Sequence, residues 1–423
     1  MSPENQAKHD EKLKRINDAI ALKEPDRVPM NPPAELFPIF NAGFTVAEVV
    51  YDISCEKIKI AMEKYLNDFD PDTCGGVGMV NAGQGAILEL SQPKNSRWAG
   101  MPGDVIDKNS LQQHIEFPLL LDDEFDMYWN DRTKWAFERV IPRMSGLLEP
   151  LSKIIGAGGD GMMMGAQMFA SLFSTPEFRE MIEKLWKINE LSAEFAQNSA
   201  RVNEYLLNLG YPSLSARAGM AGVPFDAYSD FLRGTILTME DLYYRPEDIE
   251  RFIDAQFEAT IEMIKMSKGI DEGKHVFMAL HKGMDGFLNP EHYRKYYWKH
   301  LQAIIEAIID SGHVPYIYTE GKYNSRLDCL AEVPTGKVYY HFEDVDMELA
   351  KSKLGKVACI AGGFNAARLD WGTPEQIRDE VKQLLDVCAP GGGFIFETGC
   401  GIGNAKRENV VAMFETVREY GKY

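Results

Sequence analysis

Short apolar runs and longer amphipathic stretches alternate along the second half of the chain, from about residue 270 onward. The stretch at 290–312 predicts a helix, because Leu301, Ile304 and Ile308 recur at three- and four-residue steps and Gly312 follows as a helix stop. Further helices are predicted at 324–333, 345–355, 373–389 and 406–421. The apolar runs predict strands at 274–283, 314–321, 337–344, 356–363 and 391–400.

This alternation predicts parallel strands joined by right-handed helical crossovers. Because the strand–helix units continue to the C-terminal end, we expect the second half of a (β/α)8 TIM barrel, an α/β fold preceded by N-terminal helices. Strands of the first half are predicted at 25–33, 72–80 and 213–222. An insertion at about 90–205 separates the last two, with long helices and a candidate hairpin at 114–121. We therefore expect a single barrel domain over 1–423.

The charge balance narrows the classes of partner. The chain has 64 acidic and 45 basic residues and a net charge of −19, whereas nucleic acids and anionic membranes need a basic face. The six cysteines are scattered without a CxxC pair, which is typical of reduced thiols. No apolar segment resembles a signal peptide or a spanning helix. We expect a soluble cytoplasmic protein that binds neither nucleic acid nor membrane.

Polar residues follow the predicted strands, at the end of a barrel where chemistry takes place. Loops are polar in any protein, so their position supports an active site without defining one. The residues at these strand ends are Asn31, 78–81, Arg217, His281, Lys282, Glu320, His341, Asn365 and 397–400.

Glu320 and His341 end two consecutive predicted strands, so both side chains could reach one ion. Cys400, after the last strand, could supply a third ligand, and three protein ligands with one open position is the pattern of catalytic zinc. Other roles stay open for each residue. A glutamate at a strand end can cap a helix, a lone histidine is often hydrogen-bonded in a core, and a lone cysteine is often a small buried apolar group.

His281 and Lys282 form a second candidate group, since a cation at a strand end can hold a carboxylate or a phenolate. Asp285 and Asp344 are candidates for a general acid or base, or for partners of a metal-bound histidine. Each of these four residues could equally be an ordinary polar group of a loop.

Several segments together resemble the uroporphyrinogen decarboxylase superfamily. They are PDRVPM at 25–30, FLRGTILTMEDLY at 231–243, IAGGFNAARLDWGTPEQIRDEV at 360–381 and the glycine-rich segment from 391 to 421. The superfamily comprises decarboxylases and zinc-dependent methyltransferases that work with corrinoid proteins. The decarboxylases have a basic segment after the first strand, whereas here MNPPAELF at 30–37 contains no arginine. The resemblance therefore favours a methyltransferase.

Within the superfamily, the methyltransferases that act on coenzyme M have His-x-Cys at the end of strand five, where this chain has Tyr318 to Glu320. The chain is more similar to the methyltransferase components of O-demethylases, whose zinc motif has two Glu and one His. Twenty residues separate its second Glu from its His, as they separate Glu320 from His341. The first Glu falls beside Glu306, inside a predicted helix. The third ligand therefore stays open between Cys400, Glu306 and water.

The resemblance implies transfer of a methyl group from an aryl methyl ether to the Co(I) centre of a corrinoid protein, with Zn²⁺ as a Lewis acid on the ether oxygen. Glu320 and His341 would be catalytic and, with Cys400, would bind the metal. The expected substrate-binding residues are His281, Lys282, Tyr318 and Asn365, beside the aromatic candidates Phe277, Tyr316 and Tyr339. A decarboxylase and a barrel that only binds are the alternatives. The methyl donor and the oligomeric state, a homodimer being one option, stay open.

Overall fold

Six parallel strands form the main sheet of the computed structural model, which describes residues 1–74, 80–156 and 166–423. Each strand pairs with the next in sequence, in the order β3-β4-β5-β6-β7-β8. Their bounds are β3 (Ser215–Met220), β4 (His275–Leu280), β5 (Val314–Lys322), β6 (Tyr339–Asp344), β7 (Cys359–Gly362) and β8 (Phe394–Ile395). All six lie within strands that the hydrophobic pattern predicts, apart from Lys322 at the end of β5.

Two shorter segments close the sheet into a barrel. Met30 forms a parallel bridge with Phe396, just beyond β8. The amide of Asp72 donates to the carbonyl of Met30 at 2.8 Å, and the amide of Cys74 donates to the carbonyl of Pro212 at 3.1 Å, next to β3. The predicted strands at 25–33 and 72–80 thus occupy the positions of the first two barrel strands, although 75–79 lie outside the described residues. The (β/α)8 architecture is confirmed.

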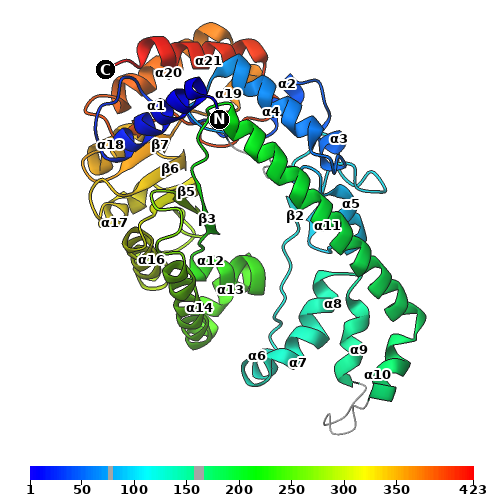
Figure 1. The fold of residues 1–423 in the computed structure, drawn as a ribbon. Coiled ribbons are helices and arrows are strands. Elements are labelled where there is room, and N and C mark those ends of the chain that lie inside the picture. The colour runs from blue at the N-terminus through cyan, green and yellow to red at the C-terminus, as the bar shows by residue number, and fades with distance from the viewer. Residues whose placement is uncertain (75–79, 157–165) are drawn as a thin grey trace.

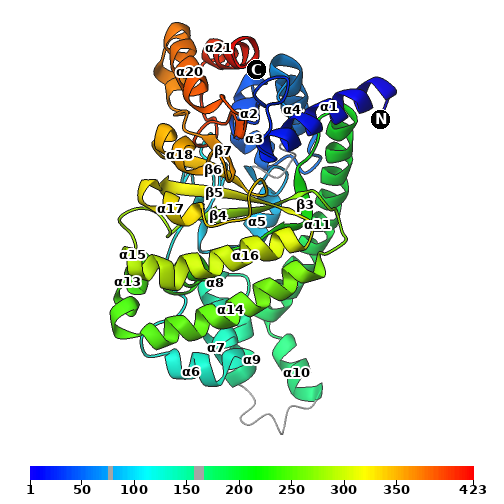
Figure 2. The ribbon, with the colours of Figure 1, turned by 90° about the vertical axis from the view of Figure 1, so that its left-hand side faces the viewer.

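Helices cover the outer face of the sheet. The amphipathic helices α14 and α16 run side by side over it in Figures 1 and 2. The helices from β3 onward are α12 (Pro224–Tyr228), α13 (Thr235–Tyr244), α14 (Pro246–Met266), α15 (Pro290–His292), α16 (Lys299–Asp310), α17 (Leu327–Leu330), α18 (Met347–Leu354), α19 (Arg368–Trp371), α20 (Pro374–Cys388) and α21 (Arg407–Tyr420). Two π-helical segments, η4 (Ser229–Arg233) and η5 (Tyr293–Trp298), lead into α13 and α16.

Two apolar cores hold the barrel together. The larger one lies between strands and outer helices and includes Met278 of β4 and Ile317 of β5. The smaller one closes the barrel from inside, where Ile16 and Ile20 of the N-terminal helix α1 (Pro3–Ile20) pack with inward residues such as Ile395. Because α1 fills the amino-terminal end of the barrel, access to the interior is left to the opposite end.

The insertion is helical and extends away from the barrel in Figure 1. Its longest helix, α11, has 33 residues and returns the chain to β3. The preceding and included elements are α2 (Phe37–Asn41), α3 (Val46–Val50), α4 (Glu56–Phe69), α5 (Gly85–Ser91), β1 (Ser96–Arg97), β2 (Gln113–His114), α6 (Phe125–Asn130), α7 (Arg132–Trp135), α8 (Ile141–Met144), α9 (Ser152–Gly156), α10 (Ala166–Phe173) and α11 (Pro176–Asn208). In the part of the chain that is described, no helix is both long and apolar enough to cross a membrane.

The hairpin predicted within 114–121 is wrong. Instead β2, at the start of this segment, pairs antiparallel with β1. The amides of Leu119 and Leu120 both donate to the carbonyl of Leu232 in η4. Backbone hydrogen bonds of this apolar run are therefore made to the barrel and not within a local hairpin.

Candidate active site at the barrel mouth

The interior of the barrel is more accessible than its outer wall. Along β5, the inward residues Tyr316, Tyr318 and Glu320 are partly exposed, whereas the outward Ile317 and Thr319 are buried. The same alternation runs along β4. Since side chains alternate between the faces of a strand, this pattern means that the interior is hollow beneath the carboxyl ends of the strands.

Three side chains from different elements meet at the mouth. His281 follows β4, Asp230 lies in η4 and Glu320 stands near the end of β5. The Nδ1 atom of His281 is hydrogen-bonded to Asp230, and its Nε2 atom lies 3.6 Å from a carboxylate oxygen of Glu320. A separation of 3.6 Å is longer than a hydrogen bond, so Nε2 is not committed to Glu320.

The backbone holds His281 in place through Asp226 on α12. The carboxylate of Asp226 accepts the amide hydrogens of His281 at 3.1 Å and Lys282 at 2.9 Å. It also accepts the hydroxyl of Tyr297 at 2.6 Å. Asp226 and Asp230 are one helical turn apart, so one short helix positions both the backbone and the ring of His281.

Electrostatics keep the His281 ring protonated. The hydrogen bond to Asp230 raises the pKa of His281 to about 9, against a partial desolvation that opposes it, and Glu320 adds to the rise. Partial burial raises the pKa of Glu320, and the neighbouring Glu343 raises it further. The mouth therefore presents an imidazolium, with a proton to donate, beside a carboxylate that is less acidic than usual.

Lys282 and Asn365 were also predicted to bind substrate. The ammonium of Lys282 lies 3.1 Å from Asp230, so one carboxylate neutralises both cations of the predicted anion site. The side chain of Asn365 is exposed after β7, and its carbonyl oxygen accepts the amide hydrogen of Ala367. Their roles as substrate-binding residues stay predictions.

His341 lies on β6, directly opposite Tyr318 of β5. As the sequence predicted, it is on the strand next to Glu320. However, its ring is only 2% exposed, and both nitrogens face protein acceptors. Nε2 lies 2.7 Å from the carbonyl of Thr398, and Nδ1 lies 2.9 Å from Glu397. Despite the cost of burial, Glu397 raises the pKa of His341.

Glu397 is the centre of this buried network. It is fully buried and accepts hydrogen bonds from the side chains of Asn31, Tyr316 and Tyr339, in addition to pairing with His341. With these donors around it, the carboxylate has little remaining capacity for a ligand. The sequence analysis placed Glu397 at a strand end but gave it no role. A single acidic residue within an apolar run was the signal that could have indicated a buried, paired carboxylate.

The remaining metal candidates do not join His341. Cys400 is exposed at the rim, where partial burial and the carboxylates of Glu343 and Glu35 raise the pKa of its thiol. Glu306 is exposed on α16, outside the barrel. Within the described ranges no three His, Cys, Asp or Glu side chains converge as a metal site. The structure therefore does not bring Glu320, His341 and Cys400 together, and their roles as metal ligands stay predictions.

Other strand-end candidates have structural partners or cannot be placed. Asp285 accepts the amide and hydroxyl of Ser325, and Asp344 is exposed. The side chain of Arg217 and residues 78 and 79 lie outside the described part of the structure. Asp226 and Asp230 were missed by the sequence reasoning, although two acids four residues apart directly after a barrel strand are a usable signal.

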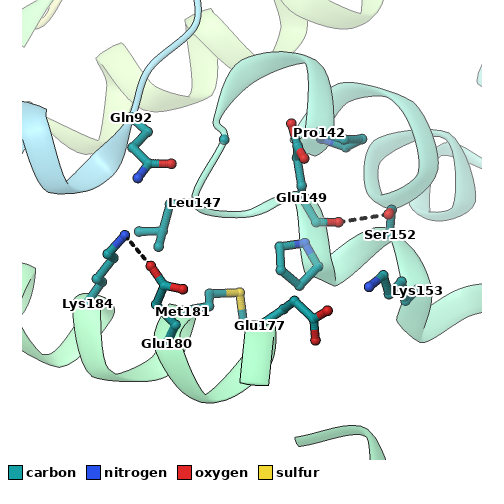
Figure 3. Close-up of a pocket in the computed structure, with 12 residues that line it drawn as sticks. Gln92, Pro142, Leu147, Glu149, Ser152, Lys153, Glu177, Glu180, Met181 and Lys184 are labelled. Carbon is teal, nitrogen blue, oxygen red and sulfur yellow. Dashed lines mark hydrogen bonds and ion pairs between the residues drawn. The ribbon is translucent and has the colours of Figure 1, made fainter. Parts of the chain in front are cut away.

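A cavity of about 390 Å³ opens inside the barrel, next to the Glu397 network. Its wall includes Asn31, His275, Phe277 and Tyr316. A second cavity, of about 450 Å³, lies in the insertion between α8, α9 and the start of α11 (Figure 3). There Lys184 pairs with Glu180 at 2.7 Å, and none of the sequence candidates lines the cavity. The barrel cavity therefore adjoins the Glu397 network, and its described lining does not include His281, Asp230 or Glu320.

The fold and the polar mouth define the chain as a (β/α)8 protein with an enzyme-like site. The family model for uroporphyrinogen decarboxylase (URO-D) matches residues 206–420, half of the chain. The chain belongs to the uroporphyrinogen decarboxylase family. The match begins at the end of α11 and covers all six strands of the main sheet.

Sequence relatives support the same grouping, and a solved structure shares the fold. The chain is 25% identical over 215 residues to a uroporphyrinogen decarboxylase of Neisseria meningitidis serogroup C, covering 48% of this chain and 59% of that protein. A uroporphyrinogen decarboxylase of Cellvibrio japonicus is 24% identical, covering 56% and 69%. The chain thus spans about three fifths of the length of the first of these relatives. A methyltransferase from Methanosarcina mazei shares the fold at a TM-score of 0.57 and 15% identity, over 97% of this chain and 98% of that one.

Proposed function

We propose that this protein is a methyltransferase that moves a methyl group from a methyl donor, an aryl methyl ether, to the Co(I) centre of a corrinoid protein. The observation that carries the proposal is the position of His281 at the mouth, where Nδ1 is hydrogen-bonded to Asp230 and Nε2 is uncommitted. The shared fold with a methyltransferase over nearly the whole chain supports it.

The chemistry requires a proton at the leaving oxygen. An aryl methyl ether transfers its methyl poorly, because the departing phenolate is a strong base compared with good leaving groups. Co(I) of the partner attacks the methyl carbon with an electron pair, the C–O bond breaks, and the bonding pair remains on oxygen. His281 Nε2 then supplies the proton to that oxygen, as a general acid. Asp230 keeps the imidazolium charged until transfer.

A decarboxylase acting on a polycarboxylate substrate is less consistent with these residues. The two cations at the mouth, His281 and Lys282, already share Asp230. Glu320 lies beside His281 and Glu343 lies near Glu320, and the charges of these two carboxylates disfavour a substrate with several carboxylates. The curated relatives that bear the name decarboxylase are about 25% identical.

Zinc stays a prediction of the sequence, and no step of the proposed mechanism passes through it. Both ring nitrogens of His341 face internal acceptors, and binding an ion at Nε2 would require breaking its hydrogen bond to the Thr398 carbonyl, whereas the pair between Nδ1 and Glu397 could remain. The site at the mouth, formed by His281, Asp230 and Glu320, supplies a proton without a Lewis acid.

The proposal is tested by incubating the purified protein with a Co(I) corrinoid protein and methoxylated arenes, and following formation of methyl-Co(III) by its absorbance. Stoichiometric release of the demethylated phenol is the expected result. The same preparation is assayed for carbon dioxide release from a porphyrinogen polycarboxylate, and its zinc content is measured. Decarboxylation without any methyl transfer would overturn the proposal.

A further inference from the structure

The turn that carries His281, residues 281–284, is held from two sides by buried side chains. On one side, the carboxylate of Asp226 accepts the amide hydrogens of residues 281 and 282. On the other side, the guanidinium of Arg326 donates to the carbonyls of residues 283 and 284, at 3.0 and 3.3 Å. Each residue of the turn thus has a backbone group bound to a buried charged side chain. Such a turn is more restricted than an ordinary surface loop.

Gly283 brings this turn into direct contact with two buried phenols. A Cβ atom at this position would lie 2.6 Å from the hydroxyl oxygen of Tyr323 and 2.7 Å from the ring of Tyr297. Both distances are shorter than van der Waals contact, so only glycine allows the backbone to approach the two rings this closely. Tyr323 follows β5, Tyr297 lies in η5, and both are fully buried. The position of the turn therefore depends on the positions of these two tyrosines.

Tyr297 is the tyrosine that also reaches Asp226. Its hydroxyl donates to the carboxylate at 2.6 Å, and its ring packs edge-on against Phe225, the residue before Asp226. Tyr297 lies in the π-helical segment η5, and Asp230 lies in the π-helical segment η4. Such segments are frequent at functional sites. Here both of them bring a polar side chain to the surroundings of His281.

Three hydrogen-bond donors meet the carboxylate of Asp226: two backbone amides and the phenol of Tyr297. The arrangement suits an ionised carboxylate, because a protonated carboxyl would place a hydrogen of its own among these donors. Burial, together with the charge of Asp230, raises the pKa of Asp226 to about 6, although the bonds from Tyr297 and the two amides oppose the rise. Asp226 is therefore ionised at neutral pH and gains a proton in mild acid.

The charged and titratable groups around Asp226 come from four parts of the barrel. They are Asp230 of η4, His281 and Lys282 after β4, Tyr293 and Tyr297 of η5, and Tyr323 after β5. The tyrosines stay neutral because burial raises the pKa of each one. Despite burial, the hydrogen bond with His281 lowers the pKa of Asp230. Of the two carboxylates beside the turn, Asp226 is thus the one whose charge changes near pH 6.

We propose that Asp226 and Tyr297 are positioning residues for proton transfer by His281, and that the ionised carboxylate of Asp226 keeps the turn 281–284 in its active position. This role rests on the proposed function, because it places the proton that Nε2 gives to the leaving oxygen. A general acid must lie within hydrogen-bonding distance of the atom that it protonates. Displacement of the turn by about 1 Å is therefore enough to slow transfer by up to about 10²-fold.

The expected consequence is an acid limb in the rate of methyl transfer. The rate should fall as pH drops through about 6, where Asp226 gains its proton and releases an amide of the turn. In Tyr297→Phe a bond that lowers the pKa of Asp226 is lost, so the acid limb should move to higher pH. In Asp226→Asn no carboxylate remains to titrate. That limb should then be absent, and the rate should be about 10- to 100-fold lower throughout.

Tyr340→Phe is the matched control for Tyr297→Phe. Tyr340 is also fully buried, but its hydroxyl donates to the carbonyl of Leu330 at 3.0 Å and not to Asp226. Each variant loses one buried hydroxyl and one hydrogen bond, so the two should lose similar stability in thermal melts. Only Tyr297→Phe should move the acid limb. It should lower kcat by about 3- to 10-fold, the usual effect of one hydrogen bond, and leave KM within about twofold, because its hydroxyl is committed to Asp226.

A titration of His281 itself separates this inference from the proposed function. The imidazole NMR signals of protein with isotope-labelled histidine are followed between pH 5 and pH 10, without methyl donor or corrinoid protein. The signal of His281 is identified by its absence in His281→Phe. We expect it to titrate near pH 9 and to show a second inflection near pH 6, as Asp226 gains its proton. The second inflection should move to higher pH in Tyr297→Phe, stay in place in Tyr340→Phe and be absent in Asp226→Asn.

The inference is overturned if Tyr297→Phe moves neither the acid limb nor the second inflection, or if Asp226→Asn keeps the wild-type rate. If Asp226→Asn does not fold, the comparison of Tyr297→Phe with Tyr340→Phe decides alone. The proposed function fails separately. Absence of methyl transfer with the second inflection intact removes the function and leaves the placement of His281 by Asp226 standing. Methyl transfer with no acid limb near pH 6 leaves the function standing and removes the role of Asp226.

Discussion

Two histidine–carboxylate pairs lie one above the other in the barrel. They contain similar residue types but differ in whether the histidine is available to a substrate. At the mouth, His281 pairs with Asp230 and keeps one nitrogen uncommitted near Glu320. Below it, His341 pairs with Glu397 and has both nitrogens satisfied. The difference teaches that an ionisable pair is available for chemistry only where the fold leaves a hydrogen-bonding atom facing an accessible space.

Removal of Glu397 should have the largest effect on stability. Glu397→Ala leaves the His341 cation buried without its counter-charge and removes the acceptor of Asn31, Tyr316 and Tyr339. We expect a loss of about 3–5 kcal/mol in the free energy of unfolding, as for other broken buried pairs. Urea denaturation measures it, and Glu397→Gln, which keeps an acceptor oxygen, should lose less. A change below about 1 kcal/mol would mean that the buried pair is dispensable.

Removal of the His281 ring should have the largest effect on activity. His281→Phe eliminates the proposed acid, and we expect methyl transfer to slow by about 10²- to 10⁴-fold, the usual contribution of general acid–base catalysis. The rate of methyl-Co(III) formation is the measurement. His114→Phe, at an exposed position in β2, is the control. Near-normal turnover by His281→Phe would remove this histidine from the mechanism.

The pH dependence should follow His281. The histidine is protonated below its raised pKa of about 9, so the rate should fall as pH rises through that value. Asp230→Asn removes the main cause of the rise, so the falling limb should move to lower pH, toward the ordinary value near 6.5. Rates measured between pH 6 and pH 10 show the shift. An unmoved limb would assign the titration to another group, and Asp254→Asn, on the exposed side of α14, is the control.

Loss of the Glu320 charge should have a modest effect. Its carboxylate lies 3.6 Å from His281 and is partly exposed, so Glu320→Gln should slow methyl transfer by roughly two- to fivefold, the size expected for an exposed ion pair. Stability should change by less than about 0.5 kcal/mol. A loss above a hundredfold together with a fall in zinc content would instead restore the predicted metal site.

Substitution of Cys400 should have the smallest effect. The thiol is exposed at the rim, and its raised pKa keeps it protonated. We expect Cys400→Ser to retain methyl transfer within about threefold, because the thiol takes no part in the proposed proton transfer and surface substitutions rarely disturb folding. Zinc analysis of the same sample is the second measurement. Inactivation with loss of bound metal would show that Cys400 is a ligand.

The barrel could be predicted from the sequence because its strands are short apolar runs with regular helical spacing between them. The outward residues of each strand are buried against the helices, and several inward ones are aromatic, so most positions of a strand are apolar. The segment at 114–121 was predicted wrongly for the opposite reason. Its backbone is hydrogen-bonded to η4, and no local sequence pattern indicates a contact with a segment more than a hundred residues away.

The candidate site was only partly predictable. Strand-end position identified His281, Glu320 and His341, since barrel topology brings strand ends together. It did not reveal that His341 lies one layer deeper in the barrel than His281, with both ring nitrogens facing hydrogen-bond acceptors. Asp230 was missed because its partnership with His281 depends on the path of η4, which the spacing of residues does not determine.

The sequence by itself determined the family, the order of the strands and which residues lie near the mouth, because periodicity and strand-end position follow from local chain geometry. Only the tertiary structure decided which histidine remains available. Protonation and access depend on side chains brought together from β4, β5 and η4, and desolvation depends on everything packed around them. The same dependence explains why His275, an unremarked residue of a predicted strand, is buried with no hydrogen-bond partner for either ring nitrogen among the described residues.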